Sequence, residues 1–260
     1  MTEPLFDMRA RALRRDRAAR TGPALFAHDR AFEDIIDRLA IVRRTFESAL
    51  LVGSANPQWS GQLAAIAPKV TVVDPAPLFA QAAGGQAMAE DALDVEPGSF
   101  DLVVAIGTLD TVNDLPGALL RLRFALRPDG LLIGAMSGGA TLPRLRDAMR
   151  AADAVSGGAS PHIHPRIEPG ALAGLLSAAG FAMPVVDVDR LSVSYRDFAS
   201  LVRDLRAMGA TNILSARPRR PVSRIALAAA AASFSSGEGE RTVETFEILH
   251  FTGWSPAEQG

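Results

Sequence analysis

Short apolar runs, separated by segments with helical periodicity, dominate the first half of the chain. Residues 49–52 and 70–73 form two such runs, and a longer one at Phe100–Ile106 is bounded by turn residues. Runs of this kind are typical of strands that a parallel sheet buries on both faces. We therefore predict strands at residues 49–52, 70–74, 100–106 and 131–136, and a weak strand at 86–89.

Amphipathic segments fill the intervals between these strands. The predicted helices are residues 5–20, 26–44, 59–67, 75–83, 113–127, 142–154 and 169–179. Because strands and helices alternate, the pattern predicts an α/β fold with a doubly wound, mostly parallel sheet. Two later stretches, 182–193 and 242–253, alternate apolar and polar residues as strands do, and the second suits an antiparallel strand at or near an edge.

A chain of 260 residues suits one large domain that carries additional segments. We assign residues 1–47 to a helical extension that packs on the core and residues 48–260 to the main domain. Within that domain, residues 196–238 form a helical insertion before the last strand, and the basic loop 216–221 interrupts it. We interpret this loop as a solvated surface loop, with the attraction of an acidic partner as the alternative.

Composition narrows the possible classes of protein. Hydrophobic residues make up 48% of the chain and charged residues 22%, which is ordinary for a soluble globular protein. No segment reaches the roughly 18–20 apolar residues of a membrane span, so we expect no transmembrane segment and a cytoplasmic location. The absence of cysteine excludes disulfides, cysteine nucleophiles and thiolate metal sites.

Arginines are concentrated in the first 20 residues, which contain six of them. The segment lacks the apolar region of a secretory signal, and its acidic residues argue against a transit peptide. No aromatic residues are interleaved to stack on bases, so we expect no nucleic-acid partner. The simplest interpretation is a solvated amphipathic helix that turns Leu5, Phe6 and Leu13 inward.

The first strand ends abruptly in small residues, and the second ends in an acid. Gly53 follows the first strand, and Asp74 closes the second. In an open α/β sheet, the order of strand, small-residue turn, helix, strand and acid builds a nucleotide pocket, whose acid accepts hydrogen bonds from the ribose hydroxyls. The turn is unusual because Gly53 is its only glycine.

His162 and His164 form the one close pair of histidines in the sequence, between Pro161 and Pro165. The pair either shapes a structured loop or contributes to a metal site. We favour the structured loop and predict no metal site.

Several segments together have the order and spacing of a known family. They are residues 98–104, 112–119 and 126–136, with support from Phe6 and Asp7 and from residues 138–142, 160–163 and 205–209. In these segments the chain resembles the class I S-adenosylmethionine-dependent methyltransferases. Within that superfamily it is similar to the biotin-pathway malonyl-carrier methyltransferase and, more closely, to the methyltransferase-like complex I assembly factors of mitochondria and bacteria.

The resemblance implies a seven-stranded sheet with an antiparallel last strand, and S-adenosylmethionine as the cofactor. Carried over to this chain, the cofactor-binding positions are Gly53, Ser54, Ala55, Asp74, Pro75, Glu90, Asp91, Ile106 and Gly107. Asp74 takes the place of the ribose-binding acid, and Glu90 or Asp91 that of the acid at the adenine amino group. Ile106 and Gly107 stand where the family binds the methionine end of S-adenosylmethionine. We assign no catalytic base, because methyl transfer requires mainly alignment and exclusion of water.

The sequence departs from the family at several positions. Leu51 stands where the family has an acid, Ala55 and Pro57 stand where it has its second and third glycines, and Asp110 with Thr111 replaces a polar-aromatic pair. Alanine adds a methyl group at a point of close approach, and proline fixes φ and removes an amide donor. The site motif is therefore degenerate.

Two interpretations of the function stay open. One is a methyltransferase-like enzyme that acts on a protein or carrier-protein substrate, and the other is a catalytically inactive scaffold with the same fold. The resemblance to assembly factors also implies maturation of a respiratory-complex subunit, with arginine hydroxylation in place of methylation. A nicotinamide-dependent dehydrogenase is disfavoured, because the phosphate-binding glycines are missing.

Overall fold

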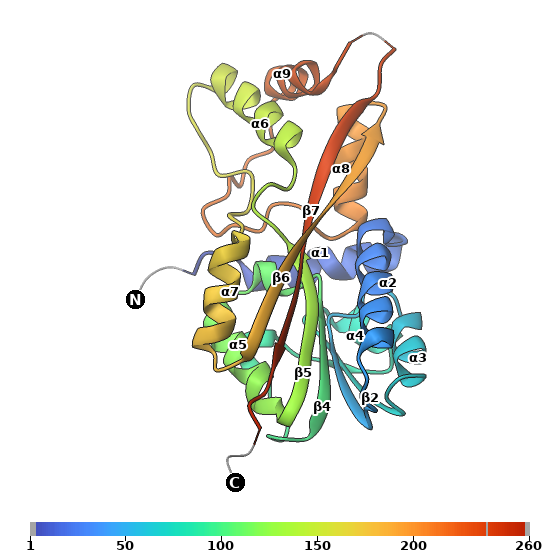
Figure 1. Cartoon of the computed structure of the whole chain (residues 1–260). Coiled ribbons are helices and arrows are strands. Elements are labelled where there is room, and N and C mark those ends of the chain that lie inside the picture. Colours follow the sequence, from blue (N-terminus) through green and yellow to red (C-terminus); the bar gives the residue numbers. More distant parts are fainter. Residues whose placement is uncertain (1–3, 238, 258–260) are drawn as a thin grey trace. The chain divides into compact units, whose positions relative to one another are not determined.

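The computed structural model describes residues 4–237 and 239–257. Within them the chain forms a seven-stranded sheet in the order β3-β2-β1-β4-β5-β7-β6 (Figure 1). The strands are β1 Ser48–Val52, β2 Lys69–Asp74, β3 Gln86–Ala87, β4 Phe100–Ile106, β5 Leu126–Ser137, β6 Ala182–Tyr195 and β7 Thr242–Trp254. The pairs among β1 to β5 are parallel, whereas β7 is antiparallel to β5. This confirms the predicted sheet, and β7 lies near an edge, inside β6.

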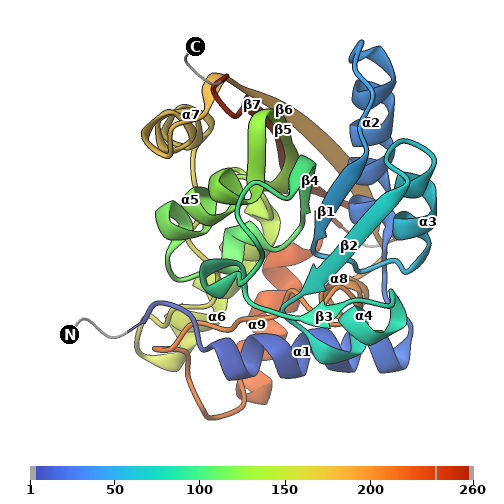
Figure 2. The same ribbon diagram turned by 90° about the horizontal axis from the view of Figure 1, so that it is seen from below.

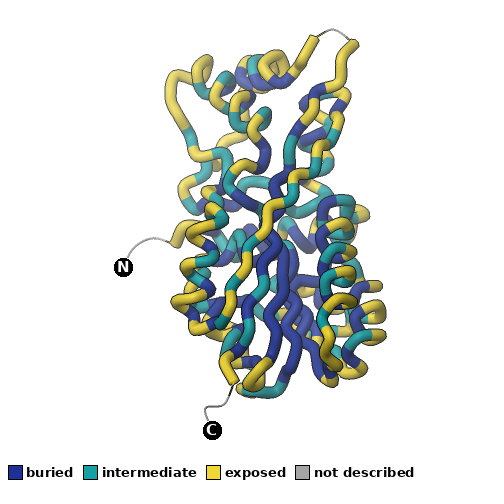
Figure 3. The backbone as a smooth tube through the Cα atoms, viewed as in Figure 1, coloured by how far each residue is buried: buried dark blue, intermediate teal, exposed yellow. Residues whose placement is uncertain are grey.

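Helices cover both faces of this sheet. The helices of the described chain are α1 Met8–Thr21, α2 Phe26–Ile41, α3 Gln58–Ala64, α4 Pro77–Ala82, α5 Leu115–Ala125, α6 Pro143–Ser156, α7 Pro169–Ala178, α8 Phe198–Ala207 and α9 Arg224–Phe234, with the 3₁₀ helices η1 Glu90–Ala92 and η2 Leu109–Thr111. α5 and α7 lie on one face, and α2 and α3 lie on the other (Figure 2). Every residue of β1 and β4 is therefore buried, which explains their continuous apolar runs (Figure 3).

Two compact units can be distinguished along the described chain. The first, here called the sheet unit, consists of Leu25–Gly138, Arg166–Asp189 and Ile248–Gly260. The second, here called the helical unit, consists of Met1–Ala24, Gly139–Pro165 and Arg190–Glu247. The helical unit contains α1, α6, α8 and α9, and α6 packs against α9 in it. The domain boundaries predicted from the sequence, at residue 47 and around 196–238, stay predictions.

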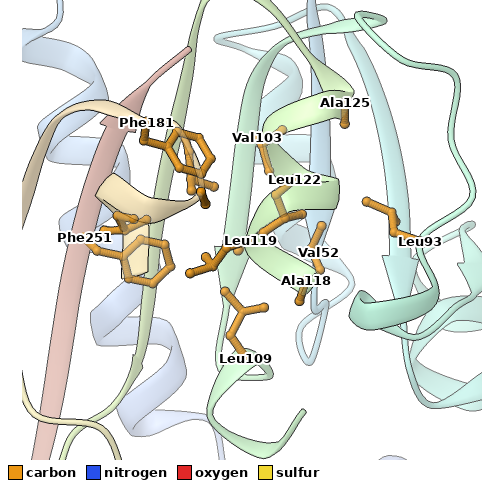
Figure 4. Close-up of a cluster of buried hydrophobic side chains, with 14 of the residues drawn as sticks. Val52, Leu93, Val103, Leu109, Ala118, Leu119, Leu122, Ala125, Phe181 and Phe251 are labelled. Carbon is orange, nitrogen blue, oxygen red and sulfur yellow. The ribbon is translucent and has the colours of Figure 1, made fainter. Parts of the chain in front are cut away.

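A hydrophobic cluster of the sheet unit holds α5 against the strands (Figure 4). Leu119 and Leu122 of α5 are fully buried in it, together with Val103 of β4 and Phe251 of β7. Burial of a leucine side chain contributes about 1.5–3 kcal/mol. The cluster therefore fixes the position of the strands whose carboxyl ends carry the candidate site. No helix in the described part of the chain is long and apolar enough to span a membrane.

Between the predicted helix 113–127 and the predicted strand 131–136, the sequence Arg-Pro-Asp-Gly at residues 127–130 favours a turn, and this interpretation is wrong because these residues lie inside β5. The pairing of β4 with β5 shifts register between Phe100 and Leu102, and Asp129 has a φ of 58°. Such an irregularity accommodates extra residues without ending a strand. β5 consequently begins directly after α5.

The apolar face predicted for the first helix is also wrong. Leu5 and Leu13 are 50% and 57% exposed, and Phe6 alone of the three predicted residues is buried. α1 instead buries Arg11 and Arg15 together with small alanines. A Cβ at Gly209 would lie 3.1 Å from Arg15 Cα, so α1 packs closely on the segment after α8. Long arginine stems can cover apolar surface, which is why the hydrophobic pattern alone picked the wrong face.

Candidate cofactor site

The turn after β1 requires glycine at residue 53. Gly53 has a φ of 84°, in the left-handed region where only glycine is unstrained. A Cβ at this position would lie 2.3 Å from the Ile106 carbonyl oxygen and 2.8 Å from Thr108 Cγ2. The turn after β1 therefore packs directly on the end of β4, and no side chain fits between them.

Asp74, at the carboxyl end of β2, is fully buried. One of its carboxylate oxygens accepts a hydrogen bond from the Ser54 N–H, and the other accepts one from the Ala76 N–H, both at 2.8 Å. The Gly53 N–H donates to the Val73 carbonyl oxygen at 2.8 Å. Because hydrogen bonds to a carboxylate are roughly twice as strong as neutral ones, Asp74 ties the turn after β1 to the turn after β2. The structure thus brings Gly53, Ser54 and Asp74 together.

A second set of polar contacts holds the rest of the turn, and sequence reasoning missed it. Asp29, in the first turn of α2, accepts hydrogen bonds from Asn56 Nδ2 at 2.9 Å and from Trp59 Nε1 at 3.1 Å. The Trp59 ring is stacked on Phe32, with centroids 4.9 Å apart. Asn56 Oδ1 accepts from the Gln58 N–H at 3.0 Å, at the start of α3. The one available signal was Trp59, because a buried indole N–H needs an acceptor.

The departures from the glycine motif fit the backbone path. Leu51 is fully buried in β1, where its register partners are Val72 and Val104. Ala55 does not have a positive φ, and Pro57 has a φ of −64°, which proline favours at the start of a helix. Neither position therefore needs the freedom of glycine. In this turn Gly53 alone has a backbone conformation that requires it.

The two acidic candidates after β3 have different environments. Glu90 is fully buried in η1, whereas Asp91 is partly exposed. Asp74 pairs with Ala87 in the register of β2 and β3, so both acids follow closely on the edge where Asp74 lies. Pro75, directly after Asp74, is partly exposed. Glu90 is thus the acid of this pair that the fold shields from bulk water.

The third part of the candidate site is the end of β4. Ile106 is buried, and Gly107 has a φ of 65° and donates its N–H to the Ala135 carbonyl oxygen at 2.8 Å. A Cβ at Gly107 would lie 2.6 Å from His28 Cδ2, so this imidazole packs directly on the Gly107 backbone. Through the neighbours His28 and Asp29, the first turn of α2 reaches the turns after both β4 and β1. Sequence patterns gave no signal for His28.

A buried ion pair follows β4. Arg166 Nη1 contacts Asp110 Oδ2, and both side chains are 7% exposed. Burial lowers the pKa of Arg166 to about 10, so its guanidinium stays charged at neutral pH. Among the residues that the structure describes, Arg166 Nε has no hydrogen-bond partner. Asp110 was visible in the sequence as a departure from the family, but nothing pointed to Arg166.

The histidine pair belongs to a hydrogen-bonded loop of the helical unit. His162 Nε2 lies 2.8 Å from Asp153 Oδ1, and His164 Nε2 accepts from the Ile213 N–H at 3.0 Å. The His164 ring meets Phe6 edge-on, with centroids 5.4 Å apart. Burial lowers the pKa of His164 to about 4, which keeps the ring neutral and able to accept. Within the described residues, no three His, Cys, Asp or Glu side chains are placed to hold a metal ion.

Comparison with known proteins identifies the family. A family model described as a methyltransferase domain matches residues 25–184. The chain is also 30% identical over 286 residues to the malonyl-[acyl-carrier protein] O-methyltransferase of Laribacter hongkongensis, in an alignment that covers 99% of this chain and 93% of that protein. The chain therefore belongs to the methyltransferase domain family.

Higher identity over a shorter region is found to mitochondrial arginine-hydroxylases. The identity is 39% over 171 residues for the protein of Danio rerio and 38% over 182 residues for that of Homo sapiens. These alignments cover 64% and 66% of this chain but 53% and 52% of the two relatives. The chain thus spans about half the length of the arginine-hydroxylases that it matches.

Solved structures share the fold at low identity. The YcgJ protein from Bacillus subtilis aligns with a TM-score of 0.60 and 12% identity, over 87% of this chain and 99% of its own. The N-methyltransferase NodS from Bradyrhizobium japonicum, solved with S-adenosylhomocysteine, aligns with a TM-score of 0.52 and 14% identity, over 95% and 98%. The likeness shows the class I methyltransferase fold.

Proposed function

We propose that this chain is a methyltransferase-like protein that binds S-adenosylmethionine at the turns after β1, β2 and β4. The observation that carries the proposal is the convergence of Gly53, Asp74 and Ile106 through hydrogen bonds and close packing. In open α/β sheets, ligands bind in the crevice outside the carboxyl ends of the strands. Membership of the methyltransferase domain family supports the same cofactor.

The residues present fit this cofactor. The turns at Gly53 and Gly107 pack directly on Ile106, Thr108 and His28, so the backbone beside the proposed cofactor is fixed in place. The carboxylates of Asp74 and Glu90 follow adjacent strands. We assign Gly53, Ser54 and Ala55 to the turn beside the cofactor, Asp74 and Pro75 to the ribose, Glu90 with Asp91 to the adenine, and Ile106 with Gly107 to the methionine end.

The chemistry that this proposal asks of the protein is modest. S-adenosylmethionine, when bound, supplies an activated methyl group on its sulfonium. The chain then has to align an acceptor with that group and exclude water. The contacts of Asp29 with Asn56 and Trp59 hold the turn in one conformation. Such preorganisation reduces the ordering cost of binding.

We propose a protein or carrier-protein substrate as the acceptor. The relatives support this class: one is a malonyl-[acyl-carrier protein] O-methyltransferase, and others are arginine-hydroxylases. The resemblance to complex I assembly factors extends the proposal to a respiratory-complex subunit. On that extension, arginine hydroxylation is the alternative to methyl transfer.

Mass spectrometry of respiratory-complex subunits tests the acceptor. Peptides from wild-type cells, from cells without the gene, and from deleted cells that carry wild-type protein or Asp74→Asn should be compared. A modification with the mass of a methyl group that depends on Asp74 supports methyl transfer, and one with the mass of an oxygen atom supports hydroxylation. Unchanged subunits in the deleted cells contradict the respiratory assignment.

An inactive scaffold is the second candidate function, and Leu51, Ala55 and Pro57 favour it. It predicts that the wild-type protein does not bind S-adenosylmethionine, whereas Leu51→Asp/Ala55→Gly/Pro57→Gly gains affinity. Because Leu51 is fully buried, Ala55→Gly/Pro57→Gly should be measured beside the triple variant as a control for folding. Binding by the wild-type protein refutes this candidate in its cofactor-free form.

We also propose a cytoplasmic location and the absence of a nucleic-acid partner. Both proposals rest on the sequence alone. The arginine-hydroxylase relatives are mitochondrial by name, so they do not support the cytoplasmic location. Cell fractionation with an antibody against the chain tests the location. Recovery in a membrane or organelle fraction contradicts it.

A further inference from the structure

The helical unit contains a cavity that shares no residue with the candidate cofactor site. Its volume is about 430 Å³, and it is lined by residues of three segments, 4–5, 161–165 and 214–216, and by Arg146 of α6. Pockets for small ligands typically measure about 300–1,000 Å³. A smaller cavity of about 240 Å³ adjoins it and shares Arg146, Pro161 and Ile163.

Two of the three wall segments are joined by backbone pairing. The Leu5 carbonyl oxygen accepts a hydrogen bond from the Ser215 N–H at 2.9 Å. Next to this contact, Phe6 and Leu214 form an antiparallel bridge. These segments are far apart in sequence, so the pairing builds a wall that neither segment forms alone.

The third wall segment is attached to the same strand-like stretch by side chains. Asn212 Nδ2 donates to the Pro161 carbonyl oxygen at 2.7 Å, and His164 Nε2 accepts from the Ile213 N–H at 3.0 Å. Because hydrogen bonds join these three wall segments to one another, this part of the cavity is preformed. A preformed site reduces the ordering cost of ligand binding.

The lining combines an apolar surface with one charged group. Pro4, Pro161 and Pro165 present no amide donors, and Leu5 and Ile163 add aliphatic side chains. Arg146 is half-buried at the lining, and within the described chain its guanidinium forms no ion pair or side-chain hydrogen bond.

The neighbouring arginine on α6 differs from Arg146. Arg150 lies one turn later on the helix and pairs with Asp147 at 3.1 Å. Among the described residues that line the cavity, the guanidinium of Arg146 is the charge available for a ligand. A charge-assisted hydrogen bond to an anion is stronger than a neutral one, and an apolar chain gains free energy on leaving water.

We propose that this cavity binds an aliphatic carboxylate, with the carboxylate on Arg146 and the hydrocarbon chain between Leu5, Ile163 and Leu214. The observation that carries the proposal is an apolar, hydrogen-bonded cavity whose lining holds one cation, Arg146, without an ion-pair partner among the described residues. The inference goes beyond the proposed function and does not depend on it.

Isothermal titration of the full chain with decanoate, below the concentration at which it forms micelles, tests the proposal. Decanol and decylamine are the uncharged and cationic probes of the same length. The wild-type protein should bind decanoate more tightly than decanol and should not bind decylamine. Arg146→Gln should weaken decanoate binding by about tenfold or more, because it removes the charge-assisted bond, and should leave decanol binding unchanged.

Two further variants separate this site from non-specific binding. Arg203→Gln removes an exposed arginine of α8 outside the cavity and should bind decanoate like the wild type. Ala216→Trp fills the cavity from an exposed position and should weaken binding of both decanoate and decanol. The proposal is overturned if the wild type does not bind decanoate, or if Arg146→Gln and Arg203→Gln bind it equally. Either result leaves the cofactor proposal intact, because the two sites share no residue.

Discussion

Replacement of Gly53 by alanine perturbs the turn after β1 at its tightest point. The new Cβ would lie 2.3 Å from the Ile106 carbonyl oxygen, on a residue that has to keep a φ of 84°. The left-handed conformation costs a non-glycine residue about 1–2 kcal/mol, and overpacking costs about 1–3 kcal/mol more. We expect Gly53→Ala to lower the free energy of unfolding by about 2–5 kcal/mol.

Gly61 provides a matched control for this substitution. It lies inside α3, and no atom is within 4 Å of an added Cβ. Alanine is more favourable than glycine in a helix interior by about 0.5–1 kcal/mol. Gly61→Ala should therefore stabilise the protein, so the same chemical change has opposite signs at two nearby positions.

Thermal unfolding followed by circular dichroism measures both effects. With about 2–4 °C per kcal/mol for a chain of this size, Gly53→Ala should lower the Tm by at least about 4 °C, and Gly61→Ala should raise it by about 1–4 °C. An unchanged or higher Tm for Gly53→Ala would refute the packing of this turn on the end of β4.

Three further predictions concern buried polar groups. Asp74→Asn retains one of two backbone hydrogen bonds and should lower the free energy of unfolding, measured with denaturant, by about 1–3 kcal/mol. A variant as stable as the wild type would contradict the bridge between the turns. Arg166→Met leaves Asp110 buried without its cation and should cost about 3–5 kcal/mol, whereas Arg166→Met/Asp110→Leu should recover most of the loss; equal losses would contradict pairing. His164 has a folded pKa of about 4 against 6.5 when unfolded, so the unfolded state binds more protons between these values and stability rises with pH across this window. His164→Gln should remove roughly 3 kcal/mol of this increase in the free energy of unfolding. Denaturant unfolding curves between pH 4 and 6.5 measure it, and an unchanged dependence of stability on pH would contradict the prediction.

The sheet was predictable because its central strands are covered on both faces. β4 coincides with the predicted segment 100–106, and β1 and β2 differ from their predictions by one residue at the start. Continuous apolar runs of this kind leave little room for another interpretation. At Asp129 in β5 the turn-forming residues were misleading. The pairing of β4 with β5 is irregular there, and a bulge accommodates such residues within a strand.

The sequence predicted only those site residues that end a strand or closely follow one. Gly53 and Asp74 follow strands, and their roles in the turns depend on residues close to those strand ends. His28, Asp29 and Arg166 contact the same region from distant parts of the sequence. No periodicity or motif records such tertiary contacts, so these residues became visible only in the structure.

The central claim is that the turns after β1, β2 and β4 bind the cofactor of the family. Isothermal titration of the purified chain with S-adenosylhomocysteine, beside Asp74→Asn, tests it most directly. We expect saturable binding by the wild type and much weaker binding by Asp74→Asn. Circular dichroism should show that both proteins are folded. Absence of heat from a folded wild-type protein at high ligand concentration would contradict the claim and favour the scaffold.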